Sequence, residues 1–383
     1  MNNLRSLFQL DPDVVFLNHG SFGATPRPVL DVYQEWQRRL ERQPVHFLAT
    51  ELPDLLAEAR QALAVYVGAA ADDVAFIPNA TFGVNLIARS LSLGPGDEVL
   101  ATDHEYGACD NVWSFLSQKQ GFSYKQQPIS LPVQSPDVVV EQFWQGVTSR
   151  TRVIFISHLS SATAVTFPIA QICARARQAG ILTIIDGAHT VGQIPLNMTA
   201  IDADFYLSNA HKWLCSPKGS AFIYARRTVQ HLLEPLVVSW GWGDDQQFSY
   251  GSNLLDYLQW MGTDDPSAYL TVPAAIAFQQ EHHWPEIRRQ CHDLLCQAVT
   301  RIGDLTGLES PYPDDACYHQ MAVAPLPPLV DLLAFKKKFY ETYRVEVPFT
   351  EWQGRQFVRI SVQGYNVPAD IDALLTALQK SFV

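Results

Sequence analysis

The sequence of 383 residues predicts an α/β protein whose large domain contains a mostly parallel sheet flanked by helices, with a smaller α+β domain at the C-terminal end. Two observations predict this division. Between about residues 70 and 230, short apolar runs alternate with helical patterns, which is typical of a parallel sheet covered by helices. After about residue 270, long helical patterns precede short strands. We expect a large domain over residues 15–265 and a small domain over residues 266–383, joined by the segment 1–14.

The strands of the large domain are predicted from six apolar runs. The run at 181–190 is almost continuous, as expected of a strand buried on both faces. A helix is predicted over 168–180, because Pro168 suits its start and Gly180 its end. The six runs, some of which continue into a turn, are 73–81, 97–108, 152–161, 181–190, 203–210 and 220–227.

The small domain is predicted from a different order of patterns. Residues 267–302 are typical of long helices. Short strands are then expected, and a closing helix ends the chain. These later elements are the strands at 320–327, 345–349 and 357–365 and the helix at 368–382.

Composition narrows the function classes. A net charge of −12 argues against coating nucleic acid or an anionic membrane. The sequence has no run of eighteen apolar residues, so no membrane span is predicted, and the N-terminus does not resemble a signal peptide. The six cysteines are scattered without a C-x-x-C pair, which indicates reduced thiols in a cytoplasm, no disulfide framework and no zinc or other metal site.

Polar residues gather where the predicted strands end. In an open parallel sheet, ligands bind outside the carboxyl ends of the strands. One aspartate at such a place is often only a helix cap, but here a lysine, a carboxylate, hydroxyls, an aromatic ring and several histidines share one edge. They are Asn79-Ala80-Thr81, His104-Glu105-Tyr106, His158 to Ser161, Asp186 with His189, and Ser208 to Lys212.

This combination suits pyridoxal 5'-phosphate. The cofactor needs a lysine for its Schiff base and an acid partner for its pyridinium nitrogen, for which Asp186 is the candidate. Its phosphate favours backbone N–H groups at a helix start together with hydroxyls. Its ring needs a flat neighbour, which Tyr106 or His104 could supply.

Several segments carry a family resemblance. The run "IIDGAHTVGQ…ADFYLSNAHKWLCSPKGSAFIYAR" resembles the class V aminotransferase family of fold type I pyridoxal-phosphate enzymes, with the closest likeness to the isopenicillin N epimerase-like branch, which is related to cysteine desulfurases and cysteine C–S lyases. An Asp-x-x-His followed by a lysine 26 residues after the aspartate is its most specific part. Further matching segments are "FLNHGSFGATP" (16–26), "PNAT" (78–81), "DHEYGA" (103–108), "SHLSSATAVTFPI" (157–169), "WMGTDDPSAYLTVPAAI" (260–276) and "VRISVQGYN" (358–366).

The resemblance implies residues that hold the cofactor. Lys212 would form the internal aldimine, and Asp186 would pair with the pyridinium nitrogen. Tyr106 would stack on the ring, where desulfurases usually have histidine, and His189 would lie near the ring. The phosphate would be contacted by Asn79, Ala80, Thr81, Ser208 and His211.

It also implies a substrate site and a subunit interface. Arg359 would clamp the substrate carboxylate bidentately, with a surface ion pair as the alternative. Ser161 falls where relatives, many of which have asparagine there, bond the phenolic oxygen. Gly262 and Thr263 resemble the segment that reaches the neighbouring subunit's phosphate site, which implies a homodimer with active sites at the interface. Two N-terminal residues complete the substrate site, Asn18 and His19.

The expected activity is an isopenicillin N epimerase-like reaction at the Cα of a small amino-acid substrate, through an external aldimine. Epimerisation needs a second acid or base on the opposite face, which Tyr106 could supply unless it only stacks. The alternatives are a cysteine or cystine C–S β-lyase, a desulfurase-like enzyme and an aminotransferase. A desulfurase would need a nucleophilic cysteine, for which Cys317 is the candidate, without the expected glycine-containing loop. A non-catalytic binding protein of this fold is expected to lose Lys212 or Asp186.

The sequence lacks the complete motifs of a serine hydrolase and of a nicotinamide-dependent enzyme. "HGSFG" lies before the first clear strand, unlike a hydrolase elbow, and "GWGDDQ" lacks the last glycine of a dinucleotide motif.

Lys218 is expected in a turn and Cys215 as a buried residue beside the site. Loops 38–55 and 236–252 are expected to line the substrate pocket, with a set of aromatics that could equally be interface core, namely Trp240, Trp242, Phe248 and Tyr250.

Overall fold

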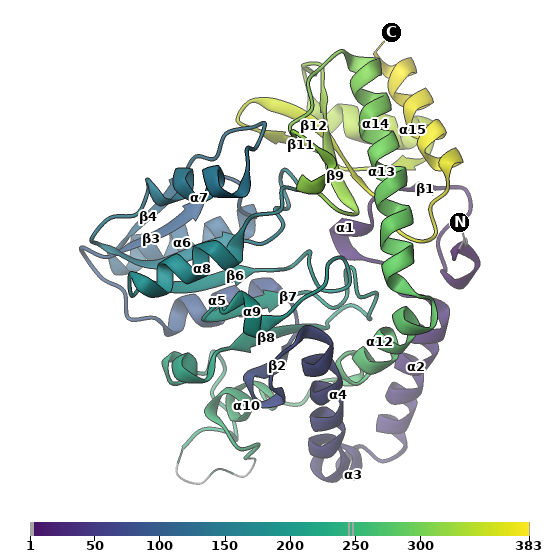
Figure 1. Ribbon diagram of the computed structural model, residues 1–383. Helices are drawn as coiled ribbons and strands as arrows, with labels where there is room; N and C mark the ends of the chain where they lie inside the picture. The colour runs from purple at the N-terminus through teal and green to yellow at the C-terminus, as the bar shows by residue number, and fades with distance from the viewer. Residues whose placement is uncertain (1–3, 244–245, 247–248, 383) are drawn as a thin grey trace.

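A computed structural model describes residues 4–243, 246 and 249–382 of the chain. A seven-stranded sheet forms the centre of the large domain, in the order β2-β8-β7-β6-β5-β3-β4 (Figure 1). Strands β3 to β7 are mutually parallel, and β8 runs antiparallel to both of its neighbours. The strands are β2 (Val74–Ile77), β3 (Glu98–Thr102), β4 (Ser123–Gln127), β5 (Thr151–Ser157), β6 (Leu182–Asp186), β7 (Phe205–Ser208) and β8 (Ala221–Ala225). The mostly parallel sheet predicted from the sequence is therefore confirmed.

Helices cover both faces of this sheet, which explains why β5, β6 and β7 are mostly apolar and are buried over almost their whole length. One face packs against α5 (Ala80–Ser90), α6 (Gly107–Gln120) and α10 (Asn253–Leu258). The other face packs against α4 (Leu52–Val67), α7 (Pro136–Trp144) and α8 (Ile169–Gln178). The predicted helix at 168–180 is thus α8, with Pro168 as its N-cap and Gly180 in a left-handed conformation just after it.

The smaller sheet is antiparallel, in the order β11-β12-β9, and Figure 1 shows it beside the long helix α13. The N-terminal segment joins this part of the molecule, because β1 (Val15–Phe16) pairs with β10 (Val345–Glu346). The remaining strands are β9 (Met321–Leu326), β11 (Phe349–Trp352) and β12 (Arg355–Ser361). The longer helices outside the central sheet are α2 (Arg27–Arg42), α12 (Val272–Glu281), α13 (Trp284–Thr306), α14 (Leu332–Tyr343) and α15 (Pro368–Ser381).

The strand directions bring several chain segments to one edge. Strand β2 is antiparallel to β8, which is antiparallel to β7, so β2 ends at the same edge as the parallel strands. Asp186 is the last residue of β6, and Lys212 follows β7 by four residues. The small sheet contributes Arg359 from β12. Within the described residues, no helix has the length and apolarity needed to cross a bilayer.

Candidate active site

A cavity of about 320 Å³ lies at this edge of the sheet. A second cavity of about 420 Å³ adjoins it, and the two share Ser21, Phe22, Tyr106, Ser161 and Lys212 in their walls. The first cavity is also lined by residues at or just after the ends of β2, β5, β6 and β7, by Cys109 of α6 and by Gly219 just before β8. These are Pro78, Asn79, Ala80, Thr81, Cys109, Ser157, Leu159, Asp186, Ala188, His189, Asn209, His211 and Gly219.

Lys212 lies in a turn that follows β7, and its amine reaches the cavity. Its Nζ is 3.2 Å from Nε2 of His189. Burial, together with the positive charge of Arg359, lowers the pKa of Lys212 to about 8 against the opposing effect of Asp186. A lysine whose amine loses its proton near neutral pH is suited to nucleophilic attack on a carbonyl.

Asp186 supplies a buried carboxylate to the same cavity. Its Oδ1 accepts a hydrogen bond of 2.8 Å from the backbone N–H of Ala188, and Cys109 lies 3.6 Å from its Oδ2. Burial raises the pKa of Asp186, while the Ala188 N–H and the charge of Lys212 lower it. A cationic partner in the cavity would compensate for this burial and keep the carboxylate ionised.

The start of α5 provides a site for an anion. Asn79 caps this helix by accepting from the N–H of Phe82, and Asn209 Oδ1 accepts from the N–H of Ala80 at 2.9 Å. Neither the N–H nor the hydroxyl of Thr81 has a hydrogen-bond partner among the described residues, so both remain for a ligand. Free donors at a helix N-terminus favour phosphate.

His211 also lines this cavity. Its Nδ1 donates to the carbonyl oxygen of Ser220 at 2.9 Å, which leaves Nε2 for a ligand. Burial, with a smaller contribution from the charge of Lys212, lowers the pKa of His211 to about 4 against the opposing effect of the Ser220 hydrogen bond. A bound dianion would raise this pKa, because it stabilises the protonated ring.

Arg359 lies on the side of the second cavity. Its guanidinium is buried and donates to the carbonyl and hydroxyl oxygens of Ser161, at 2.8 and 3.0 Å, and to Oγ of Ser21 at 3.0 Å. Its Nε has no partner, and no carboxylate forms an ion pair with it among the described residues. The alternative of a surface ion pair is therefore wrong, because the side chain is buried and unpaired.

Tyr106 lies in the walls of both cavities and is 48% exposed. The residue before it, Glu105, is buried and accepts hydrogen bonds from Thr102 and from the N–H and hydroxyl of Ser157. These bonds tie the chain after β3 to the end of β5, so Tyr106 is held at the opening. His104, the other residue expected to offer a flat ring to the cofactor, points elsewhere: it packs on Trp352 and is not in either cavity wall.

Several expected site residues lie outside the two cavities. Ser208 is fully buried and donates to the carbonyl of Gly187, because it is the last residue of β7 and points away from the cavity. His19 touches the carbonyl of Lys212 at 3.0 Å and the hydroxyl of Tyr365, and so supports the lysine turn. Asn18 binds Glu346 and accepts from Ser21. Gly262 and Thr263 are exposed and do not reach the cavity of their own chain.

The two loops expected to line a substrate pocket do not do so within the described residues. No described residue of 38–55 or 236–252 is in either cavity wall. Trp240 and Trp242 are 51% and 56% exposed, and Tyr250 is partly buried, with its backbone N–H bonded to Asp256 of α10. Phe248 lies outside the described residues.

No role was predicted from the sequence for several residues of the cavity walls, among them Asn209, Ser21, Phe22 and Cys109. Asn209 lies three residues before Lys212, and its amide joins the start of α5 to the lysine turn. Ser21 holds Arg359, Phe22 is 74% exposed at the opening, and Cys109 contacts Asp186. Only the contact of Asn209 could have been predicted from the sequence. Alternate residues of a strand face opposite sides, so Ser208 and Asn209 at the end of β7 point apart and only one of them can face the cavity.

The described side chains fit pyridoxal phosphate. One cavity is lined by the reactive amine of Lys212, the buried carboxylate of Asp186 and the free donors of Thr81 at the start of α5. Each of these groups would hold a different part of the cofactor, namely its aldehyde, its ring nitrogen and its phosphate.

Comparisons with known proteins agree with this fit. The family model described as aminotransferase class-V matches residues 15–325. The chain is 34% identical to isopenicillin N epimerase of Amycolatopsis lactamdurans, covering 99% of this chain and 98% of the relative. It is 28% identical to a probable chloroplastic L-cysteine desulfhydrase of Arabidopsis thaliana, covering 96% and 83%. A solved structure of a C-DES variant with glycine covalently linked to its pyridoxal phosphate cofactor has a TM-score of 0.84, at 20% identity and 98% coverage of both chains.

The fold and the site together define a pyridoxal-phosphate enzyme of fold type I. The chain belongs to the aminotransferase class-V family, whose model matches most of its length. Its cofactor is pyridoxal phosphate, and its relatives include epimerases and C–S lyases.

Proposed function

We propose that this enzyme removes the Cα proton of an amino acid whose carboxylate is held by Arg359, and that it returns the proton to the opposite face as an isopenicillin N epimerase-like enzyme does. The observation that carries the proposal is the buried guanidinium of Arg359, which has no carboxylate partner among the described residues and shares a cavity with Lys212. An unpaired buried cation beside a reactive amine is the arrangement expected of an anionic-substrate site. The likeness to the epimerase of Amycolatopsis lactamdurans supports the choice of reaction.

Different residues of the chain would bind the substrate carboxylate and transfer the proton. Arg359 would bind the substrate carboxylate through its guanidinium, with Ser21 and Ser161 fixing its orientation. Pyridoxal phosphate, when bound, supplies a ring that accepts negative charge from Cα. Asp186 would stabilise a proton on the ring nitrogen, and the amine of Lys212 would take the proton from Cα.

The remaining residues would bind the phosphate or support the groups that line the cavity. Thr81 and His211 would donate to the phosphate, with the start of α5 behind them, and Asn79, Ala80 and Asn209 would hold that helix start in place. Ser208 does not line the cavity, so we propose no phosphate contact for it. Asn18 and His19 would position the substrate side through Ser21 and the lysine turn rather than by touching the substrate.

A C–S β-lyase is the second candidate, favoured by the likeness to the Arabidopsis desulfhydrase. It would use the same residues for proton removal, and then a sulfur leaving group would depart from Cβ. A desulfurase using Cys317 is less well supported. Cys317 is not in either wall of the Lys212 cavities, and burial together with Asp314 raises its pKa, whereas a nucleophilic thiol needs a lowered one.

One experiment separates these outcomes. The holoenzyme is incubated with single amino acids in deuterated water, and Cα deuteration, loss of chirality, pyruvate and sulfide are measured separately. We expect deuteration with loss of chirality for at least one amino acid. Pyruvate formation would replace the epimerase proposal by the lyase, and no deuteration with any amino acid would contradict both.

Tyr106 tests the opposite-face proton transfer. It shares a cavity with Lys212, and with the proton returned by its hydroxyl, Tyr106→Phe should keep Cα deuteration while loss of chirality falls about a hundredfold. The change preserves the ring and its stacking. If both rates fall together, Tyr106 only supports the cofactor; if neither falls, another group returns the proton.

We also propose a homodimer in the cytoplasm. Gly262 and Thr263 are exposed and line neither cavity of their own chain, so a second subunit would be needed for them to contact a phosphate. Phe22 and Tyr106 at the cavity opening are large and exposed, as expected of a surface that a partner covers. The six cysteines are free thiols, which supports a reducing compartment. Sedimentation measurements on the holoenzyme test the dimer.

A further inference from the structure

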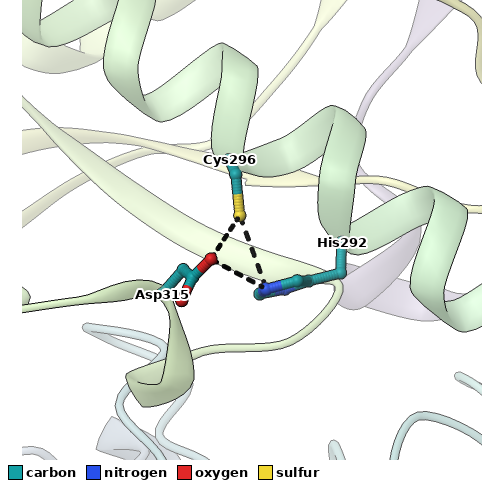
Figure 2. A group of neighbouring side chains, drawn as sticks. All are labelled: His292, Cys296 and Asp315. Carbon is teal, nitrogen blue, oxygen red and sulfur yellow. Dashed lines mark hydrogen bonds and ion pairs between the residues drawn. The ribbon is translucent and has the colours of Figure 1, made fainter.

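Three side chains that commonly bind metals converge on the surface of the small domain, away from the Lys212 cavities (Figure 2). His292 and Cys296 are four residues apart on α13 and so project from the same face of the helix. Asp315 reaches them from the 3₁₀ turn η5 (Asp315–Cys317). Two segments that are separate in the sequence therefore place a nitrogen, a sulfur and an oxygen around one point.

The distances match those between ligands of one metal ion. Nε2 of His292 lies 3.4 Å from Sγ of Cys296 and 3.8 Å from Oδ2 of Asp315. The sulfur and the carboxylate oxygen are also 3.8 Å apart. Zinc–ligand bonds of about 2.0–2.3 Å at tetrahedral angles put neighbouring ligand atoms roughly 3.3–3.6 Å from one another. Side-chain adjustments of a few tenths of an ångström would complete three corners of a tetrahedron.

The hydrogen bonds behind these atoms orient them for coordination. Nδ1 of His292 donates to the carbonyl oxygen of His319 at 2.8 Å, which places the lone pair of the neutral ring on Nε2. Metal-bound histidines are commonly oriented in this way. The hydroxyl of Tyr318 lies 3.4 Å from Sγ of Cys296 and can donate to a thiolate there.

A cysteine-hydrolase arrangement does not explain the cluster. In such a triad the carboxylate binds the histidine nitrogen that faces away from the cysteine. Here Asp315 and Cys296 face the same nitrogen, Nε2, while the carbonyl of His319 occupies the other.

We propose that His292, Cys296 and Asp315 bind one divalent transition-metal ion of the zinc class, with water as the fourth ligand. The nitrogen, sulfur and oxygen donors suit zinc, and a thiolate with a carboxylate balances its two positive charges. The side chain of Asp315 is 66% exposed, so the ion can enter from solvent. This site departs from the sequence-based expectation of no metal, because a His-x-x-x-Cys followed by an aspartate 19 residues later matches no familiar zinc spacing.

The bound ion would tie α13 to the segment that leads into β9. That strand pairs with β12, where Arg359 lies opposite Val323. The site would therefore stabilise the sheet that carries the proposed substrate-binding arginine. Because zinc would bind the folded state, it should raise the melting temperature of the holoenzyme. The proposal does not depend on which reaction the Lys212 site catalyses.

Zinc binding tests the proposal directly. Metal-free holoenzyme is dialysed against Zn²⁺, bound metal is measured by elemental analysis, and the zinc environment is measured by X-ray absorption. We expect one zinc per chain with one sulfur at roughly 2.3 Å and lighter ligands at about 2.0–2.2 Å. Cys296→Ser and Asp315→Asn should each weaken binding at least about a hundredfold, since even supporting residues change affinity by 10–100-fold.

Cys317→Ser is the matched control, because Cys317 lies two residues from Asp315 and is partly exposed but is not one of the three ligands. It should bind zinc like the original chain at equal cofactor content. A second measurement needs no variant: zinc should protect Cys296 from alkylation by iodoacetamide and leave Cys317 reactive. Unchanged zinc affinity in Cys296→Ser, a spectrum without sulfur, or alkylation of Cys296 unaffected by zinc would each overturn the site.

Discussion

His189 lies with its Nε2 3.2 Å from Nζ of Lys212. The other ring nitrogen, Nδ1, accepts a hydrogen bond of 3.3 Å from the indole N–H of Trp213. Burial holds the pKa of His189 well below its usual range, so the ring is neutral and its one proton must be on Nε2. That proton can only be donated to Lys212 if the amine presents a lone pair. The arrangement therefore stabilises the neutral amine that attack on the cofactor aldehyde requires.

The first prediction concerns the pH dependence of cofactor attachment. The pKa of Lys212 is lowered to about 8, so its amine is protonated below that pH and free above it. The rate at which apoenzyme takes up pyridoxal phosphate, followed by visible absorbance, should rise up to about tenfold per pH unit and level off above about 8. Measurements above pH 7 avoid the second ionisation of the phosphate, which falls near pH 6.

Arg359→Gln should move this midpoint to higher pH, because the positive charge of Arg359 helps to lower the pKa of Lys212. Arg355→Gln is the matched control, since Arg355 lies on the same strand but outside both cavities. A midpoint near the ordinary lysine value of 10.5, or one that Arg359→Gln leaves in place, would contradict the charge effect.

The second prediction tests the indole hydrogen bond. In Trp213→Phe, the ring of His189 can carry its proton on Nδ1 and accept from a protonated Lys212 through Nε2. The midpoint of cofactor uptake should then rise by up to about one pH unit, since a hydrogen bond contributes about 0.5–1.5 kcal/mol and one unit corresponds to about 1.4 kcal/mol. Trp284→Phe removes another buried indole bond, to Gly192, and should leave the midpoint unchanged.

The fold was predicted well where burial left a clear pattern. The apolar runs at 152–161, 181–190 and 203–210 are β5, β6 and β7, which lie in the middle of the sheet. Strand β4 was missed because it is an edge strand with the polar sequence Ser-Tyr-Lys-Gln-Gln, and several of its residues are exposed. Periodicity therefore identifies strands covered on both faces and misses those that solvent reaches.

The site was predicted in part, for a related reason. Strand ends place Asp186 and Lys212 at one edge by topology alone, and the structure has them in one cavity. Arg359 comes from another sheet, 147 residues after the lysine, so only the family resemblance suggested it. The contacts of Asn209 with Ala80 and of Ser21 with Arg359 join distant segments, and no local pattern predicts such pairs.

The third prediction separates the two lysines of the segment 208–222. Lys212→Ala should abolish the covalent link to the cofactor and lower Cα deuteration by a factor of at least about 10², the range expected for a lost general base. Lys218 donates to the carbonyl of Gly23 at 3.0 Å and is not in the cofactor cavity wall, so Lys218→Ala should keep the visible absorbance. Mass spectrometry after borohydride reduction identifies the modified lysine. Cofactor attached to Lys218 would reverse the assignment.

The last prediction concerns Gly23, which packs the N-terminal segment against the lysine turn. Its φ is +69°, and a Cβ there would lie 2.0 Å from the carbonyl oxygen of His211 and 2.9 Å from Cα of Lys212. Gly96 provides a matched control, because its φ is +98° and a Cβ there meets nothing within 4 Å. Gly96→Ala should cost only the left-handed strain, about 1–2 kcal/mol in the free energy of unfolding. Gly23→Ala should cost clearly more and also slow cofactor uptake, since the backbone of His211 and Lys212 must move. Urea unfolding and uptake rates measure the two effects, and equal results for the two variants would show that the turn does not depend on this close contact.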